Sequence, residues 1–118
     1  RFSLPQIPEG PKSRPVIAMD YNLYVRHSGG FERPSKAGEF ADRTYQAFRA
    51  AFDAQYQGKR IPLELGFHFT LMNGGAYWRA LERFAAEICT KPHVECISYR
   101  DLAQRIRAED IGQPAPAN

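Results

Sequence analysis

Residues 61–69 read IPLELGFHF, and the alternation of side chains along this stretch decides the fold that the sequence predicts. In an extended chain, side chains two residues apart share a face. The apolar face consists of Leu63, Leu65, Phe67 and Phe69, and the opposite face of Glu64, Gly66, His68 and Thr70. One wholly apolar face is typical of a strand that packs against helices, so we predict a β-strand over residues 61–69.

Helical periodicity precedes and follows this strand. Apolar side chains recur every three or four residues in residues 36–56 and again in residues 76–89. The two stripes consist of Ala41, Tyr45, Phe48, Phe52 and Tyr56, and of Trp78, Leu81, Phe84, Ala85 and Ile88. This spacing predicts an α-helix in both segments. Gly58 suits the end of the first helix, where glycine is favoured.

Two further strands complete the expected order. We predict strands over residues 15–20, with an extension to Val25 left open, and over residues 94–98, followed by a short last helix to about Arg107. Residues 26–35 are expected to form a loop. Alternating strands and helices are typical of parallel sheets with crossover helices. The sequence therefore predicts an α/β fold of three β-α units with parallel strands, either a small open sheet or part of a larger barrel.

Size and composition set the class of protein. The chain has 118 residues, 43% of them hydrophobic, and a net charge of +3, which suits one modest globular domain. Its basic residues are dispersed among acidic ones, so nucleic-acid binding is not expected. No apolar run approaches the roughly 18 residues of a membrane span. The proline-rich residues 1–14 predict a linker or an extended connection, and residues 112–118 a disordered tail.

The two cysteines, Cys89 and Cys96, are either free buried thiols or a disulfide. Their placement favours the disulfide, because Cys89 ends the predicted helix and Cys96 lies early in the predicted third strand. The bridge would join this helix to the strand on which it packs. Disulfides persist in oxidising compartments, so the pair indicates a periplasmic or extracellular protein.

His68 and Asp20 are the candidate catalytic residues. Each lies near the C-terminal end of a predicted strand, where α/β barrels place their active sites. Histidine suits general acid–base catalysis, and a carboxylate beside it orients and stabilises its charged form. The alternatives are a structural histidine and an aspartate that caps a loop. We assign no role to His27 or His93, and no histidine pair has the spacing of metal ligands.

The wording of several stretches resembles the polysaccharide deacetylases, the NodB-homology carbohydrate esterases. The stretches are residues 65–78 (LGFHFTLMNGGAYW), residues 80–89, residues 96–102 (CISYRDL) and residues 15–25 (PVIAMDYNLYV). The resemblance implies that residues 15–111 form the C-terminal part of a (β/α) barrel. It also implies a hydrolase that removes acetyl groups from acetylated polysaccharides or oligosaccharides with the help of a divalent metal, zinc or similar.

The same resemblance implies roles for individual residues. His68 matches the histidine that protonates the leaving group, and Asp20 the carboxylate that tunes this histidine, although Tyr21-Asn22 stand where the family has a tryptophan. Asn22, Tyr24, Leu71 and Asn73 are the residues expected to contact the substrate. The family's paired-aspartate motif and its histidine-pair motif are missing, so no metal ligands are expected in this chain. We therefore expect the chain alone to be inactive and to need an N-terminal half or a second chain.

A second class of function remains open. The chain could be a non-catalytic α/β domain that binds a glycan or a protein and completes its fold by pairing with another chain. Such a domain would have the same sequence features, but His68 would have no catalytic role in it. Whether the chain is an enzyme at all therefore depends on the surroundings of His68 and Asp20.

Overall fold

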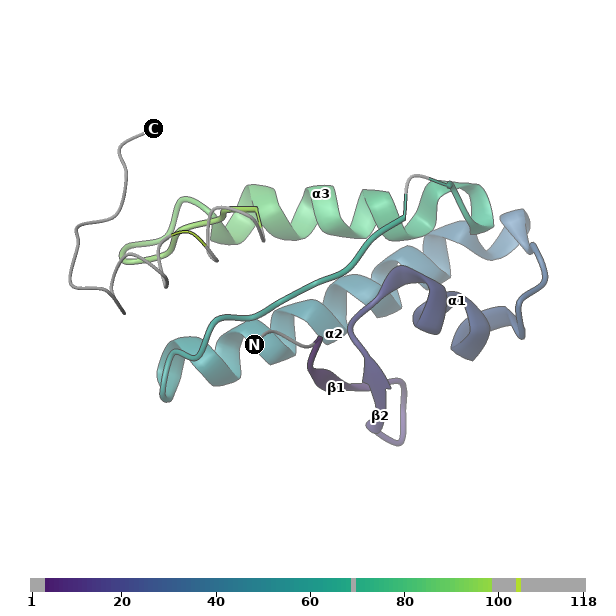
Figure 1. Ribbon diagram of the computed structural model, residues 1–118. Coiled ribbons are helices and arrows are strands. Elements are labelled where there is room, and N and C mark those ends of the chain that lie inside the picture. Colours follow the sequence, from purple (N-terminus) through teal and green to yellow (C-terminus); the bar gives the residue numbers. More distant parts are fainter. Residues whose placement is uncertain (1–3, 69, 99–103, 105–118) are drawn as a thin grey trace. The chain divides into compact units, whose positions relative to one another are not determined.

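The computed structural model describes residues 4–68, 70–98 and 104 (Figure 1). In chain order the elements are β1 (Gln6–Glu9), β2 (Arg14–Ile17), α1 (Asp20–Ser28), the 3-10 turn η1 (Pro34–Lys36), α2 (Ala37–Gln57), the 3-10 turn η2 (Asn73–Gly75) and α3 (Ala76–Ile88). The chain divides into two compact units, Arg1–Glu87 and Ile88–Asn118.

The sheet of the first unit is an antiparallel hairpin, so the prediction of a parallel sheet is wrong. Strands β1 and β2 pair in the register Gln6 with Ile17 and Ile7 with Val16. Within residues 4–68, 70–98 and 104 there are no parallel strands and no part of a barrel. Strand β1 lies in the predicted linker. It forms because Gly10, at a φ of 81°, turns the chain back, with Ser13 N donating to Gly10 O at 3.0 Å.

Residues 20–28 form helix α1, although the sequence analysis predicted a strand end and a loop there. The buried side of α1 consists of Asp20, Leu23, Tyr24 and Ser28. Its two ends are polar, so the apolar periodicity that identifies a helix is missing. Gly29 ends α1 in the left-handed conformation, with its N–H donating to Val25 O. Gly29, which the sequence predicts to lie in a loop, thus terminates a helix.

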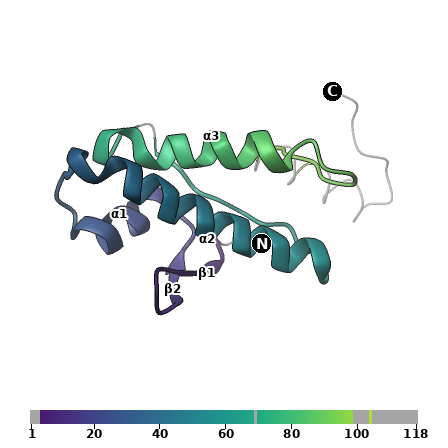
Figure 2. The same ribbon diagram turned by 180° about the vertical axis from the view of Figure 1, so that it is seen from behind.

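The segments predicted as the second and third strands have no strand partner in the described chain. Residues 61–68 run back along α2 as an extended connection, seen in teal in Figures 1 and 2. They contain one isolated parallel bridge, between Met19 and Gly66. Residues 94–98 form neither helix nor strand. Alternating side chains suit a strand, but without a neighbouring backbone no ladder of hydrogen bonds forms.

Helices α2 and α3 confirm the predictions from helical periodicity, to within one residue at each end. They pack through aromatic rings: Phe48 and Phe84 have centroids 5.7 Å apart, and Phe52 and Phe84 6.1 Å. Phe48 also contacts Phe67 of the extended connection, at 5.9 Å. These edge-to-face contacts join α2, α3 and residues 61–68 in one core.

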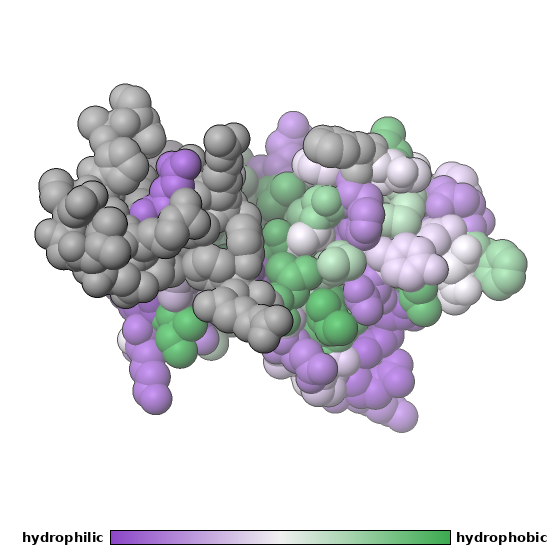
Figure 3. Space-filling model, in the orientation of Figure 1, coloured by the Kyte–Doolittle hydropathy of each residue, from purple (hydrophilic) through white to green (hydrophobic). Residues whose placement is uncertain are grey.

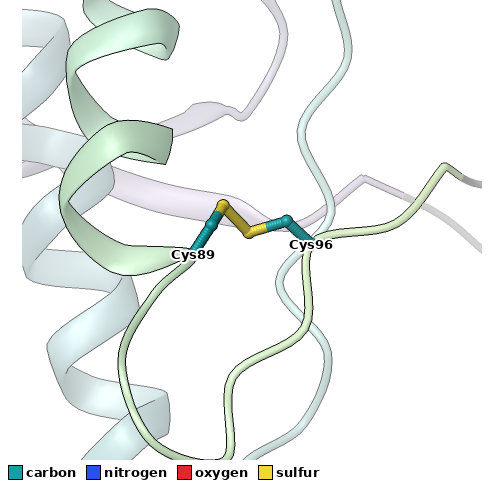
Figure 4. The surroundings of a disulfide bond; sticks show 2 residues. All are labelled: Cys89 and Cys96. Carbon is teal, nitrogen blue, oxygen red and sulfur yellow. A yellow bond between two sulfur atoms is a disulfide. The ribbon is translucent and has the colours of Figure 1, made fainter.

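The second unit contains the predicted disulfide. Cys89 and Cys96 are bonded, with their Cα atoms 5.6 Å apart (Figure 4). The bond closes a loop directly after α3. The predicted last helix, apart from Gln104, and the predicted tail lie outside the described residues. In the described part of the chain, no helix combines the length and the apolar character needed to cross a membrane.

Candidate functional site

Asp20 and His68 lie against each other in the first unit. Asp20 Oδ1 accepts a hydrogen bond from His68 Nδ1 at 2.7 Å, and Oδ2 accepts one from the backbone N–H of His68 at 2.8 Å. Oδ1 also accepts from the backbone N–H of Tyr21 at 2.7 Å. Asp20 is fully buried, whereas the His68 side chain is 54% exposed. The structure thus brings the two predicted catalytic residues together, with the carboxylate inside and the imidazole at the surface.

Backbone contacts between two distant segments produce this meeting. Gly66 N donates to Ala18 O at 2.8 Å, and Asp20 N donates to Gly66 O at 3.0 Å. This single parallel bridge pairs Gly66 with Met19, so His68 follows the bridge by two residues on one segment and Asp20, the first residue of α1, follows it by one on the other. A carboxylate in the first turn of a helix is also stabilised by the helix dipole. The juxtaposition expected at the edge of a parallel sheet therefore arises from one bridge and a helix start.

The hydrogen bonds assign the tautomer of His68. An ionised carboxylate only accepts hydrogen bonds, so the proton of the neutral imidazole lies on Nδ1, facing Asp20. The other ring nitrogen, Nε2, then accepts a proton from a ligand, or donates one once the ring is charged. Asp20 compensates that charge at 2.7 Å. An imidazole held by a buried carboxylate in this way is suited to proton transfer.

Trp78 supports the backbone of His68. Its indole Nε1 donates to His68 O at 2.8 Å, and its ring lies 5.1 Å from that of Phe67. The Tyr21 ring lies edge-on to the imidazole, with centroids 6.5 Å apart. Helical periodicity places Trp78 on the packing face of its helix and gives no sign of this bond. Only a known contact with residue 68 could have revealed it.

The predicted substrate-binding residues differ in their exposure. Leu71 is 64% exposed and Asn22 is partly buried. Tyr24 is buried, and its hydroxyl donates to Gly30 O at 2.8 Å. Asn73 is fully buried. Among these four residues, Leu71 and Asn22 have surface for a ligand.

Asn73 belongs instead to a buried chain of hydrogen bonds. Its Nδ2 donates to Ser28 Oγ at 3.1 Å and to the Tyr77 hydroxyl at 3.0 Å. The Tyr77 hydroxyl lies 3.1 Å from His27 Nδ1, and His27 Nε2 lies 2.9 Å from Glu9 Oε2. Since the Glu9 carboxylate only accepts, His27 donates to it from Nε2. Hydrogen bonds thus connect Asn73 to Glu9 through Tyr77 and His27.

Two groups in this network have shifted pKa values. Burial raises the pKa of Glu9, but the hydrogen bonds and the positive charges of His27 and Arg43 together outweigh this and lower it from 4.5 to about 2. Burial raises the pKa of Tyr77 from 10.0 to about 12, against the opposing hydrogen bond from Asn73. Glu9 is therefore ionised and Tyr77 neutral at physiological pH. His27, to which the sequence analysis gave no role, joins the two and has a side chain with no exposed surface.

The described residues do not form a metal site. No three histidine, cysteine, aspartate or glutamate side chains of residues 4–68, 70–98 and 104 gather closely enough to hold an ion. The carboxylate of Asp20 is already occupied by three hydrogen bonds from Tyr21 and His68. The donor set around His68 therefore suits proton transfer and does not fit a divalent cation.

Comparison with known proteins adds no relative: no protein-family model, no curated protein and no solved structure matches this chain.

Proposed function

We propose that Asp20 and His68 are the acid–base pair of a metal-dependent polysaccharide deacetylase, with His68 as general acid and Asp20 as the carboxylate that tunes it. One observation carries this proposal: a fully buried carboxylate binds Nδ1 of an imidazole that is 54% exposed. The resemblance of residues 65–78 to the polysaccharide deacetylases supports the choice of reaction. The substrate class is acetylated polysaccharides or oligosaccharides.

The proton moves in one direction during the step assigned to His68. When the tetrahedral adduct of water and the acetyl group collapses, the bond from its carbon to the sugar nitrogen or oxygen breaks. The leaving atom takes the bond electrons and needs a proton, which Nε2 of the charged imidazole donates. His68 ends neutral with its remaining proton on Nδ1, facing Asp20. Acetate carries the oxygen of the water, and the sugar leaves as an amine or an alcohol.

Activation of the water belongs to groups other than these two residues. The divalent metal of such an enzyme finds no ligand set among the described residues. We therefore assign the metal, zinc or similar, to an N-terminal half or to a second chain. The chain then contributes the proton-donating side of the site. Its disulfide supports a periplasmic or extracellular location, because such bonds persist under oxidising conditions.

Acetate release by the complete protein tests the proposal. With zinc and acetylated chitin oligosaccharides or acetylated xylan, we expect His68→Ala to lower kcat by about 10²–10⁴, the usual contribution of a general acid. His93→Asn is the matched control, because His93 is an exposed histidine in the second unit. Acetate release by His68→Ala at the rate of the unaltered protein would remove His68 from the mechanism.

A second candidate is a non-catalytic binding domain that pairs with another chain. The observation in its favour is apolar surface on the outer side of β2 and α1. Ile17 is 38% exposed, Tyr21 52% and Val25 42%. Tyr21 and Val25 are four residues apart on α1 and so lie on one face of the helix. Sedimentation of the 118-residue chain distinguishes this candidate from the deacetylase. A pairing domain should sediment as a dimer or as a mixed complex. The double substitution Tyr21→Ser with Val25→Ser should dissociate that complex.

A further inference from the structure

We propose that a pocket at the turn of the β1–β2 hairpin binds a small oxyanion, a phosphate or a carboxylate group. The pocket has a volume of about 470 Å³ and is lined by Glu9, Gly10, Pro11, Lys12, Arg14 and Arg43. Pockets of about 300–1,000 Å³ are those that take small molecules. In Figure 3, hydrophilic residues gather in purple at the lower edge of the view, where Figure 1 places the hairpin. None of the lining residues belongs to the Asp20–His68 pair.

The charge of the lining is positive. Lys12 and Arg14 come from the hairpin, and Arg43 comes from α2. Lys12 and Arg14 make no side-chain ion pair with any residue that the structure describes. Glu9 is the single acidic lining residue, so cations outnumber it three to one. A negative ligand would therefore enter a field of favourable sign.

Glu9 does not oppose an anion, because its carboxylate is already compensated. The side chain has no exposed surface. Its Oε1 accepts from Arg43 Nη2 at 2.9 Å, and its Oε2 accepts from Arg43 Nε and His27 Nε2, each at 2.9 Å. Arg26 Nη1 adds a fourth contact, 3.5 Å from Oε1. The carboxylate thus serves as an internal anchor paired with Arg43, and the net positive charge that the lining offers to a ligand is that of Lys12 and Arg14.

The same anchor fixes Arg43. Its two bonds to Glu9 use Nε and Nη2, which is the bidentate geometry of a guanidinium on a carboxylate, and Nη1 takes part in neither. Gly10 lies beside it at a φ of 81°, and a Cβ at this position would lie 2.9 Å from Arg43 Nη2. A glycine therefore both makes the turn and leaves room for the guanidinium. Arg43 is 30% exposed and is held in place before any ligand arrives.

Guanidinium and ammonium groups are the usual partners of phosphate and carboxylate oxygens. Both carry only hydrogen-bond donors, so a ligand has to supply acceptors. A metal cation is repelled by the same three side chains. The cluster is local and the chain's other basic residues are dispersed, which favours a small ligand over a nucleic acid. The two sources of such chemistry are a phosphorylated and a carboxylated small molecule.

Titration of the 118-residue chain with four probes tests the site. The probes are inorganic phosphate, glucose 6-phosphate, galacturonate and neutral glucose. Binding of each probe is monitored through the backbone amide signals of Gly10 and Lys12 in NMR spectra. We expect saturable shifts with at least one anionic probe and none with glucose. Tighter binding of the phosphate probes would identify a phosphorylated ligand, and tighter binding of galacturonate a carboxylated one. Lys12→Ala with Arg14→Ala should weaken binding at least tenfold.

The control removes two positive charges elsewhere. Lys36→Ala with Lys59→Ala changes two exposed lysines that do not line the pocket, so it lowers the net charge equally. Binding by this control within twofold of the unaltered chain supports a local site. Equal weakening in both double variants, shifts that spread over the surface without saturation, or no response to any anion would overturn the proposal. Folding of each variant is checked by its amide spectrum before titration.

Discussion

Asp20 binds His68 at two points, with Oδ1 on the ring Nδ1 and Oδ2 on the backbone N–H. A single buried carboxylate therefore sets both the position of the backbone at residue 68 and the direction of the ring. The third bond, from Tyr21 N to Oδ1, uses the start of α1 to hold the carboxylate itself. All three donors need an acceptor oxygen, and the two carboxylate oxygens of Asp20 supply it.

Asp20→Asn tests this double contact. An asparagine has one side-chain oxygen, so its Nδ2 faces at least one N–H donor. We expect the free energy of unfolding to fall by about 2–3 kcal/mol, since buried donors lose their partner. Nitrogen-15 NMR of the His68 ring should show loss of the Nδ1–H tautomer. Asp42→Asn is the control, because Asp42 is 60% exposed in a 3.4 Å pair with Arg83. Equal effects of the two substitutions would contradict the assignment.

Trp78→Phe tests the support from α3. Phenylalanine keeps a ring beside Phe67 but loses the N–H that donates to His68 O. We expect a loss of about 1 kcal/mol in stability, the net value of one hydrogen bond, and faster amide exchange at residues 66–68. In the complete protein, kcat should fall while KM stays nearly constant. Unchanged exchange at residues 66–68 would show that the bond does not hold the segment.

Glu9 predicts acid sensitivity. Its pKa is about 2 in the folded chain and 4.5 ordinarily, so below pH 4.5 the unfolded chain takes up a proton that the folded chain does not. The stabilisation is complete above pH 4.5 and is lost as the pH falls towards 2, with a total of roughly 3 kcal/mol. Urea unfolding from pH 6 to about 2 measures this slope.

Glu9→Gln should flatten that slope and destabilise the chain at neutral pH by about 2–4 kcal/mol. Arg43 and Arg26 then lose their carboxylate, and removal of one partner from a buried ion pair is costly. Glu82→Gln is the matched control, because Glu82 is exposed on α3. A slope in Glu9→Gln as steep as in the unaltered chain would place the acid sensitivity in other carboxylates.

The disulfide makes a prediction for the second unit. Iodoacetamide should label neither cysteine of the denatured, unreduced chain and both cysteines after reduction, as seen by mass spectrometry. Closure of the loop of residues 89–96 corresponds to roughly 2.5 kcal/mol in the chain-entropy account. Cys89→Ser with Cys96→Ser should therefore speed amide exchange in residues 88–98 and leave exchange in α1 unchanged. Labelling without a reductant would show that the bond does not form in solution.

Helical periodicity predicted the two long helices because their stripes are apolar throughout. Phe48, Phe52 and Phe84 lie where the spacing placed them. Helical periodicity did not predict helix α1, because the buried side of this helix begins with the polar Asp20 and ends with the polar Ser28. A better signal was available: the acidic residue in the first turn, the basic residues in the last turn and Gly29 directly after them are typical helix boundaries.

The pairing of Asp20 with His68 could be anticipated, but its cause could not. We expected two parallel strands, whereas one bridge at Gly66 brings the residues together. Alternation along residues 61–69 indicates an extended chain and says nothing about a partner, because the partner comes from elsewhere in the chain. His27 was missed for the same reason: Glu9 and Tyr77 are 18 and 50 residues away in sequence.

Trp78 is the only tryptophan of the chain, and its indole N–H is bonded to His68 O. Tryptophan emission, excited at a wavelength that the six tyrosines barely absorb, therefore reports selectively on the segment that carries the imidazole, without an added dye. A ligand that displaces His68 should change the emission maximum or the quantum yield of this single fluorophore. The chain thus contains its own optical probe for screening glycans, and a plate reader suffices to follow it.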